Sequence, residues 1–295
     1  MADGVIIIDK PEGISSFSVV ARVRRLFGEK KVGHTGTLDP LATGVLPILV
    51  GRAVKGSDFL LTSDKHYIAT IKLGIATDTE DITGTVIAKS EDIPTEARVR
   101  EVVASFIGSY EQIPPMYSAI KVGGKKLYEL AREGKTIERE GRLVTIENIV
   151  VEKISDDEYT LDVTCSKGTY IRTLCADIGL KLGSFGTMKT LRRAEAAGFT
   201  LDDAIRLDVL ENMNEEERLS ALLPTEKIFE KYRAVILPDF FSRLAHSGLE
   251  IYLKKISDEG TLGERVRMCD KAGFFALGEI REFEGGLAIK PIKQF

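Results

Sequence analysis

The sequence predicts an α+β protein with a large mixed domain followed by a small β-rich one. In segments 67–73 and 159–165, apolar residues alternate with polar or smaller ones, which is typical of half-buried strands. Helical apolar spacing recurs between and around these strands. Near the C-terminus, short apolar runs are broken by Asp-Lys-Ala-Gly and Glu-Gly-Gly turns, which predicts a small β-meander.

The first elements follow a strand, turn and helix order. The apolar run 5–8 predicts a buried strand, and "DKPEG" predicts the turn after it. Ser15 or Ser16 then caps a helix, because the apolar residues that follow recur at helical spacing, and Gly28 ends it. Tight turns rich in Gly and Thr lead into a second buried strand, 45–50.

The middle of the chain predicts two more helices and a long excursion. A capped helix is expected near 95–107. The segment of about 112–142 mixes a Pro pair, a Gly pair and many charges, which indicates a long excursion with a short helix ended by Gly134. A further helix is expected from Gly168 or Thr169, with Arg172 pointing away from its apolar face.

These patterns divide the chain of 295 residues near Lys231. We expect a large domain over residues 1–230 and a small one over 231–295. Length and composition are those of an ordinary globular protein, and no run of about 18 apolar residues predicts a membrane span. The three cysteines form no Cys-x-x-Cys pair, so we expect buried thiols in a reducing cytoplasm.

The net charge of −4 argues against a nucleic-acid partner, but its distribution weakens that objection. Residues 201–250 hold six Lys and Arg against eleven Asp and Glu, so one acidic segment carries the deficit. Basic clusters lie elsewhere, at 22–25, 30–31, 121–126 and 192–193. Each cluster is either part of an RNA-binding track or simply a solvated face.

Several kinds of catalytic site lack support in the sequence. The three histidines are scattered without metal-ligand spacing, and the acidic segment "TDTEDITG", 77–84, reads as a solvated turn rather than a calcium loop. No phosphate-binding loop, dinucleotide fingerprint or Gly-x-Ser-x-Gly elbow is present. The sequence therefore predicts neither a metal nor a cofactor.

A carboxylate remains as the candidate catalytic group. Asp39 stands alone among Gly, Thr and small apolar residues, on a turn fixed by Pro40. An ionised Asp in an apolar setting needs a nearby cation, and Arg172 is our candidate. The structural alternative is that Asp39 only caps a helix or closes an Asx turn.

Several motifs in order resemble those of the TruB family of RNA pseudouridine synthases. "GHTGTLDPLATGVLPI" resembles the family's catalytic motif, and "DKPEGISS" its Lys-Pro box. "KHYIATIKLGIATDTEDITG" resembles its tyrosine motif, and "PPMYSAIKVGGKKLYELAREG" its RNA-binding thumb. "SKGTYIRTLCADIG" and "LRR" resemble the remaining site motifs. The resemblance covers roughly the first two hundred residues, and the C-terminal segment matches a PUA-like domain by pattern and position only.

The resemblance implies the fold and the site. The expected fold is the pseudouridine synthase catalytic fold, a mixed, largely antiparallel sheet with flanking helices, plus a small β-rich PUA-like RNA-contacting domain. Asp39 is implied as the catalytic nucleophile or base, acting by C1′ attack, C2′ deprotonation or C6 addition. The substrate-binding residues implied by the same motifs are Lys10, His34, Tyr67, Tyr170, Arg172 and Leu191.

Three of these residues have more specific expected roles. The resemblance makes Tyr67 the stacking tyrosine and a proposed base for late proton removal, and makes His34 a residue that holds the flipped base. Arg172 would be the ion partner of Asp39. Without the resemblance, Tyr67 reads as a core aromatic of a strand and His34 as a turn residue.

The resemblance also implies the reaction and its setting. Uridine in the T loop of tRNA, at position 55, would be flipped out and isomerised to pseudouridine, with no metal or cofactor. The protein would be a cytoplasmic monomer that binds the T arm of tRNA and needs no protein partner or membrane. The competing interpretation is a non-catalytic RNA chaperone that uses the same basic clusters.

Overall fold

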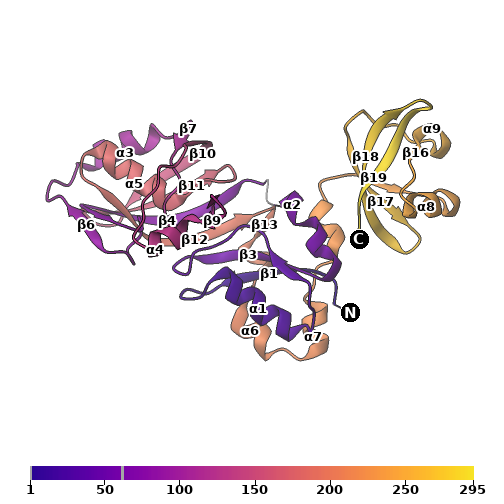
Figure 1. The fold of residues 1–295 in the computed structure, drawn as a ribbon, viewed down its shortest axis with the longest axis horizontal. Coiled ribbons are helices and arrows are strands. Elements are labelled where there is room, and N and C mark those ends of the chain that lie inside the picture. The colour runs from indigo at the N-terminus through magenta and orange to yellow at the C-terminus, as the bar shows by residue number, and fades with distance from the viewer. Residues whose placement is uncertain (1, 61–62) are drawn as a thin grey trace.

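The computed structural model describes residues 2–60 and 63–295. These residues form a large ten-stranded sheet, a separate five-stranded sheet and two two-stranded hairpins. Figure 1 shows an elongated molecule in which the five-stranded sheet, near the C-terminus, lies at the end opposite to α3 and β6. None of the helices in the described ranges is long and apolar enough to cross a membrane.

The large sheet is mixed and largely antiparallel, as predicted. Along the order β14-β1-β3-β12-β4-β11-β10-β7, only the β14–β1 and β3–β12 pairs are parallel. β2 and β13 pair with β3 and β12 beside this path. Its strands are β1 Gly4–Lys10, β2 Val32–His34, β3 Thr43–Val50, β4 Lys65–Leu73, β7 Gly108–Gln112, β10 Arg142–Lys153, β11 Glu158–Cys165, β12 Gly186–Ala196, β13 Phe199–Thr200 and β14 Ile205–Arg206. The predicted α+β class is therefore confirmed.

The helices of the large part begin close to their predicted caps. Ser15 Oγ accepts a hydrogen bond from Ser18 N at 3.1 Å, which caps α1, and Gly28 beyond its end has a φ of 59°. Thr95 caps α3 in the same way. The helices are α1 Ser16–Leu26, α2 Ser57–Leu60, α3 Glu96–Ala104, α4 Leu127–Arg132, α5 Ile171–Leu182, α6 Leu207–Asn212 and α7 Glu215–Ser220, with short 3₁₀ turns η1 Gly51–Gly56, η2 Leu201–Asp203 and η3 Thr225–Phe229.

Helix α5 lies directly on the large sheet because two glycines face each other. A Cβ on Gly179 would lie 2.0 Å from the backbone nitrogen of Gly186 in β12, so no larger residue fits there. The helix begins at Ile171, later than the predicted Gly168 or Thr169, because Tyr170 is still extended. This close packing fixes the C-terminal half of α5 against the sheet, and the other end of the same helix carries Arg172.

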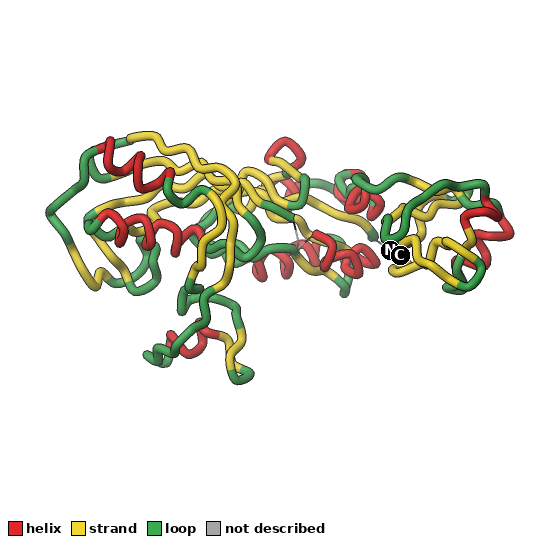
Figure 2. The backbone as a smooth tube through the Cα atoms, turned by 90° about the horizontal axis from the view of Figure 1, so that it is seen from above, coloured by secondary structure: helices red, strands yellow, loops and turns green. Residues whose placement is uncertain are grey.

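Two hairpins lie outside the sheets. β5 Ile75–Thr77 pairs with β6 Val86–Lys89, and β8 Lys121–Val122 pairs with β9 Lys125–Lys126 just before α4. In Figure 2 the segment that contains α4 projects from one side of the main body. Lys121 and Lys125 are exposed on it.

The C-terminal part has its own sheet and core. Its strand order is β15-β17-β18-β19-β16, so β17 to β19 form the predicted meander. A separate cluster of buried apolar residues lies between this sheet and α8. The elements are β15 Ala234–Ile236, α8 Asp239–His246, β16 Ile251–Tyr252, α9 Leu253–Ile256, β17 Arg265–Asp270, β18 Gly273–Phe283 and β19 Gly286–Gln294.

Candidate active site

Asp39 lies on a loop between β2 and β3 that is held from both sides. Ser16 at the start of α1 binds the preceding residue twice: its Oγ accepts from Leu38 N at 2.8 Å and donates to Leu38 O at 2.9 Å. The following residue is held as well, because Pro40 O accepts from Gly13 N at 2.8 Å. The Asp39 backbone is thus fixed by the turn and helix that follow β1.

Lys10 holds the same loop from within the protein. Its side chain is fully buried, and Nζ donates to Pro11 O and Ile14 O, each at 2.8 Å, and to Pro40 O at 3.3 Å. Burial lowers the pKa of Lys10 to about 8, although the nearby Asp39 carboxylate opposes that shift. The structure therefore places Lys10 beside Asp39 with its ammonium bound to backbone carbonyls.

Arg172, the second residue of α5, reaches the Asp39 carboxylate. Its Nε lies 2.9 Å from Asp39 Oδ2, and the two side chains are 5% and 36% exposed. An arginine can hold a carboxylate through two parallel hydrogen bonds, but here the other two nitrogens bind backbone carbonyls instead. Nη1 donates to Thr79 O at 3.1 Å, and Nη2 donates to Tyr117 O at 2.8 Å. One guanidinium thus joins the Asp39 loop to two further segments.

The acidic segment 77–84 is part of this site, so its interpretation as a solvated turn is wrong. Asp81 is buried, and its Oδ1 accepts from Thr79 Oγ1 at 2.9 Å and from Thr83 N at 3.0 Å. These bonds close the loop so that Thr79 O faces Arg172, whose Nη1 lies 4.0 Å from Asp81 Oδ2. The threonines two residues on either side of Asp81 are the sequence signal that could have revealed this turn.

The Asp39 carboxyl is subject to opposing influences. Burial raises its pKa above the ordinary value, and the adjacent Arg172 lowers it by charge and hydrogen bonding. Asp81 adds a smaller upward effect, and Lys10 a smaller downward one. The result is a raised pKa, so the ionised form of Asp39 is more basic than an exposed aspartate and depends on Arg172.

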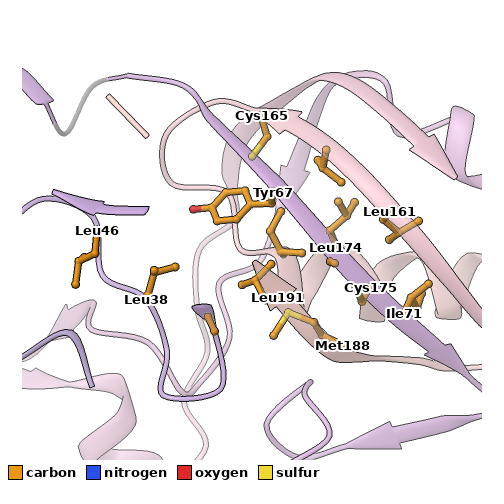
Figure 3. Close-up of a cluster of buried hydrophobic side chains, with 14 of the residues drawn as sticks. Leu38, Leu46, Tyr67, Ile71, Leu161, Cys165, Leu174, Cys175, Met188 and Leu191 are labelled. Atoms are coloured by element: carbon orange, nitrogen blue, oxygen red, sulfur yellow. The ribbon is translucent and has the colours of Figure 1, made fainter. Parts of the chain in front are cut away.

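Tyr67 and Leu191 lie side by side on β4 and β12, next to the Asp39 loop. Both are largely buried, at 7% and 8% exposure. In Figure 3 the Tyr67 hydroxyl points toward the side where Leu38 and Leu46 lie, away from Leu174 and Met188. Burial raises the pKa of Tyr67. The phenol therefore combines an apolar setting with a hydroxyl directed to the segment that bears Asp39.

His34 ends β2 and has an unusual environment. Its Nδ1 is buried and has no hydrogen-bond partner among the residues that the structure describes. Burial lowers the pKa of His34, and the charge of Arg193 lowers it further, so the imidazole is neutral at physiological pH.

Tyr170 lies at the N-cap of α5, two residues before Arg172. The side chain of Gln112, at the end of β7, binds both backbone polar groups of Tyr170. Its Oε1 accepts from Tyr170 N at 2.8 Å, and its Nε2 donates to Tyr170 O at 3.1 Å. Burial raises the pKa of Tyr170. The end of β7, where the projecting segment begins, is thereby joined to the start of α5.

Arg193 does not lie on a surface track, which corrects the basic cluster expected at 192–193. Its side chain is fully buried. The neighbouring Arg192 is partly exposed and pairs with Asp9 through Nη1 at 3.2 Å and Nη2 at 2.9 Å. The two arginines were predicted to form one charged patch, because the local sequence does not show which face of the strand each side chain occupies.

The candidate site therefore gathers residues from segments that lie far apart in the chain. In the described part of the chain, no group of three or more His, Cys, Asp or Glu side chains is arranged to hold a metal ion. The three cysteines are buried free thiols.

Comparison with known proteins places this arrangement in a family. Residues 24–171 match the model of the TruB family pseudouridylate synthase N-terminal domain, and residues 172–238 match that of the tRNA pseudouridylate synthase B C-terminal domain. The chain is 44% identical to tRNA pseudouridine synthase B of Clostridium tetani, over 94% of this chain and 95% of that one. It is 45% identical to the protein of the same name from Alkaliphilus oremlandii, over 95% of this chain and 93% of that one.

Solved structures agree with this placement. A chain of a Cbf5-Nop10-Gar1 complex superposes with a TM-score of 0.74 at 27% identity, over 99% of this chain and 85% of that chain. A chain of an archaeal box H/ACA sRNP Nop10-Cbf5 complex superposes with a TM-score of 0.70 at 25% identity, over 99% and 86%. The chain described here belongs to the TruB family of pseudouridylate synthases.

Proposed function

We propose that this protein isomerises uridine 55, in the T loop of tRNA, to pseudouridine. Membership of the family and the likeness to tRNA pseudouridine synthase B support the general activity, an isomerase that forms pseudouridine in tRNA. The observation that carries the proposal is the Asp39–Arg172 pair, a carboxylate held on a rigid loop by a buried guanidinium. The T-loop position follows from the resemblance of the motifs.

Asp39 is the reacting group in this proposal. The uracil is detached from ribose C1′, rotated and reattached through C5, with Asp39 as nucleophile at C1′, as base at C2′ or as nucleophile at C6. All three routes begin with an ionised carboxylate. Arg172 favours that form, while burial raises the pKa of Asp39 and so strengthens it as a base or nucleophile.

The remaining site residues would receive the flipped base. Extruding a nucleotide costs a few kcal/mol, which contacts in the pocket must offset. We assign stacking to Tyr67, apolar contact to Leu191 and further pocket contacts to Tyr170. His34 holds the flipped conformation. Lys10 supports the Asp39 loop from the protein side.

The two parts of the chain divide the RNA contacts. We propose that residues 1–230 form the catalytic domain, with the segment of about 112–142 as an RNA-binding thumb, and that residues 231–295 form a PUA-like RNA-contacting domain. The exposed lysines on the thumb suit phosphate contacts. The protein would act in the cytoplasm as a monomer, on the T arm of tRNA, without a cofactor or protein partner.

Site mapping on defined transcripts tests this function. Unmodified tRNA would be incubated with the protein, and pseudouridine would be located by carbodiimide labelling with primer extension. We expect modification at position 55 alone, and none in a transcript with cytidine at that position. Modification of other uridines with position 55 untouched would contradict the assignment.

A further inference from the structure

Arg193 lies at the junction of three strands beside the candidate site. On β12 it is paired with Tyr67 of β4 in antiparallel register and with Gly44 of β3 in parallel register. Side chains that lie opposite each other on an antiparallel pair project to the same face. The guanidinium of Arg193 and the phenol of Tyr67 therefore share one face of the sheet. A Cβ on Gly44 would lie 2.2 Å from Arg193 O, so the strand backbones also approach closely there.

The guanidinium is only partly satisfied by the protein. Nε donates to Val45 O at 2.8 Å, and Nη2 donates to Gly36 O at 2.9 Å. Within the described ranges, Nη1 is buried without a well-formed hydrogen bond, although Tyr67 lies close enough to interact with Arg193, and no carboxylate forms an ion pair with Arg193. A buried charge without a counterion and a buried unpaired donor each oppose folding. The hydrogen bonds to Val45 O and Gly36 O hold β3 and the segment before Asp39, but they leave the charge of Arg193 uncompensated, and a neighbouring anion would stabilise it.

Four ionisable groups experience the charge of Arg193: Lys10, His34, Lys65 and Tyr67. Burial is the main influence on each pKa, lowering those of the two lysines and the histidine and raising that of Tyr67. Arg193 opposes the rise of the Tyr67 pKa, whereas Cys165 and Asp39 add to it. Of these four groups, only Tyr67 becomes an anion when it loses its proton. An otherwise uncompensated guanidinium thus stabilises the Tyr67 phenolate.

We propose that Arg193 is a positioning residue that stabilises the Tyr67 phenolate through its unpaired Nη1, so that Tyr67 can accept the proton from uracil C5. The proposal rests on the proposed function. The phenol first loses its proton to solvent. After the C1′–C5 bond forms, the C5–H bond breaks and its proton passes to the phenolate oxygen. The released electron pair forms the C5–C6 double bond, the former C6–N1 π pair moves to N1, and N1 takes a proton from solvent.

The first test measures Tyr67 directly in the full-length protein without RNA. Tyrosines labelled with ¹³C at Cζ are titrated by NMR, and Tyr67→Phe identifies the Tyr67 signal. We expect Arg193→Gln to raise the titration midpoint of Tyr67 by about one pH unit or more, because the neighbouring cation is lost. Arg193→Lys should restore part of the shift. Arg192→Gln, which removes the adjacent arginine, is the matched control and should leave the midpoint unchanged.

This readout needs no activity, so it separates the inference from the proposed function. An equal Tyr67 midpoint in wild type and Arg193→Gln would overturn the inference, as would an equal shift in Arg192→Gln. If Arg193→Gln does not fold, the comparison of wild type with Arg193→Lys replaces it. The expected result is then a smaller upward shift, and no shift would overturn the inference.

The second test follows the chemistry in single-turnover reactions with tRNA. We expect Arg193→Gln to slow turnover by about tenfold at neutral pH, as one unit of pKa implies, and to recover rate as pH rises. Deuterium at uracil C5 should slow this variant more than wild type, because proton removal limits it. A loss of rate that is equal at every pH, without an isotope effect, would make Arg193 a purely structural residue.

Discussion

Replacing Arg172 by lysine keeps the positive charge at the site but removes the planar guanidinium. The wild-type side chain makes three contacts: Nε to Asp39 Oδ2 at 2.9 Å, Nη1 to Thr79 O at 3.1 Å and Nη2 to Tyr117 O at 2.8 Å. A lysine ammonium at the end of a flexible chain cannot reproduce all three directions at once. We expect it to pair with Asp39 and to leave both carbonyls without this donor.

The contacts set the size of the effect. A buried polar group left without its partner costs about 1–3 kcal/mol, so two carbonyls cost about 2–6 kcal/mol before water relieves part of it. If about 2.7 kcal/mol of this loss appears in the transition state, turnover falls about 100-fold. Binding of tRNA should stay within several-fold of wild type, because Arg172 is only 5% exposed and turned toward protein groups.

The assay is single-turnover pseudouridine formation, with tRNA affinity measured by filter binding on the same samples. Circular dichroism and urea unfolding report how much of the loss is structural. Turnover of Arg172→Lys within about twofold of wild type would refute the three-contact argument, since that is less than 0.5 kcal/mol. A large loss of binding with normal turnover of the bound tRNA would instead make Arg172 an RNA contact.

Three further predictions test the contact between β3 and β12, the pH dependence of stability and the RNA surface. Gly44→Ala should lower the free energy of unfolding by about 2–4 kcal/mol, because φ is +103° and the new Cβ would meet Arg193 O; an unchanged urea midpoint would contradict this. Burial lowers the pKa of Lys10 from 10.5 to about 8, so between these values the unfolded chain binds more protons than the folded one. The free energy of unfolding of wild type, minus that of Lys10→Met, should therefore rise with pH between about 8 and 10.5. If this difference were the same at pH 7 and pH 10, the lowered pKa of Lys10 would be excluded. Replacing Arg25 and Lys121 together by Glu should weaken tRNA binding. The slope of the log binding constant against log salt concentration should become shallower by about one unit per lost phosphate contact. An unaltered slope would show that the two residues are only solvated surface charges.

Local sequence patterns predicted the elements that depend on neighbouring residues. The α1 helix, its Ser15 cap and the positive φ of Gly28 follow from spacing and turn chemistry, and the structure confirms them. The strands β4 and β11 follow from strict alternation. We also predicted from the sequence that Asp39 and Arg172 are partners. In the structure, Arg172 Nε lies 2.9 Å from Asp39 Oδ2, although the two residues are far apart in the chain.

Features that depend on distant packing were misread. The segment around Asp81 is rich in polar residues, so it resembled a solvated turn, yet its backbone faces a guanidinium from α5. Arg193 was predicted as half of a surface cluster, but the pairing of β12 with β3 and β4 buries it, and its Nη2 binds Gly36 O in the segment before Asp39. The local sequence did not show that Arg193 lies on the buried face of β12, nor that the carbonyl of Thr79 points inward.

In our proposal an ionised Asp39 carries out the isomerisation, and the variant Asp39→Asn removes that charge. The amide keeps the size and turn preference of the side chain and removes its charge. Single-turnover reactions on unmodified tRNA, with pseudouridine at position 55 as the readout and tRNA affinity measured in parallel, give the result. We expect a folded protein that binds tRNA within several-fold of wild type and forms no pseudouridine, whereas near-normal turnover of Asp39→Asn would show that the charge of Asp39 is not required.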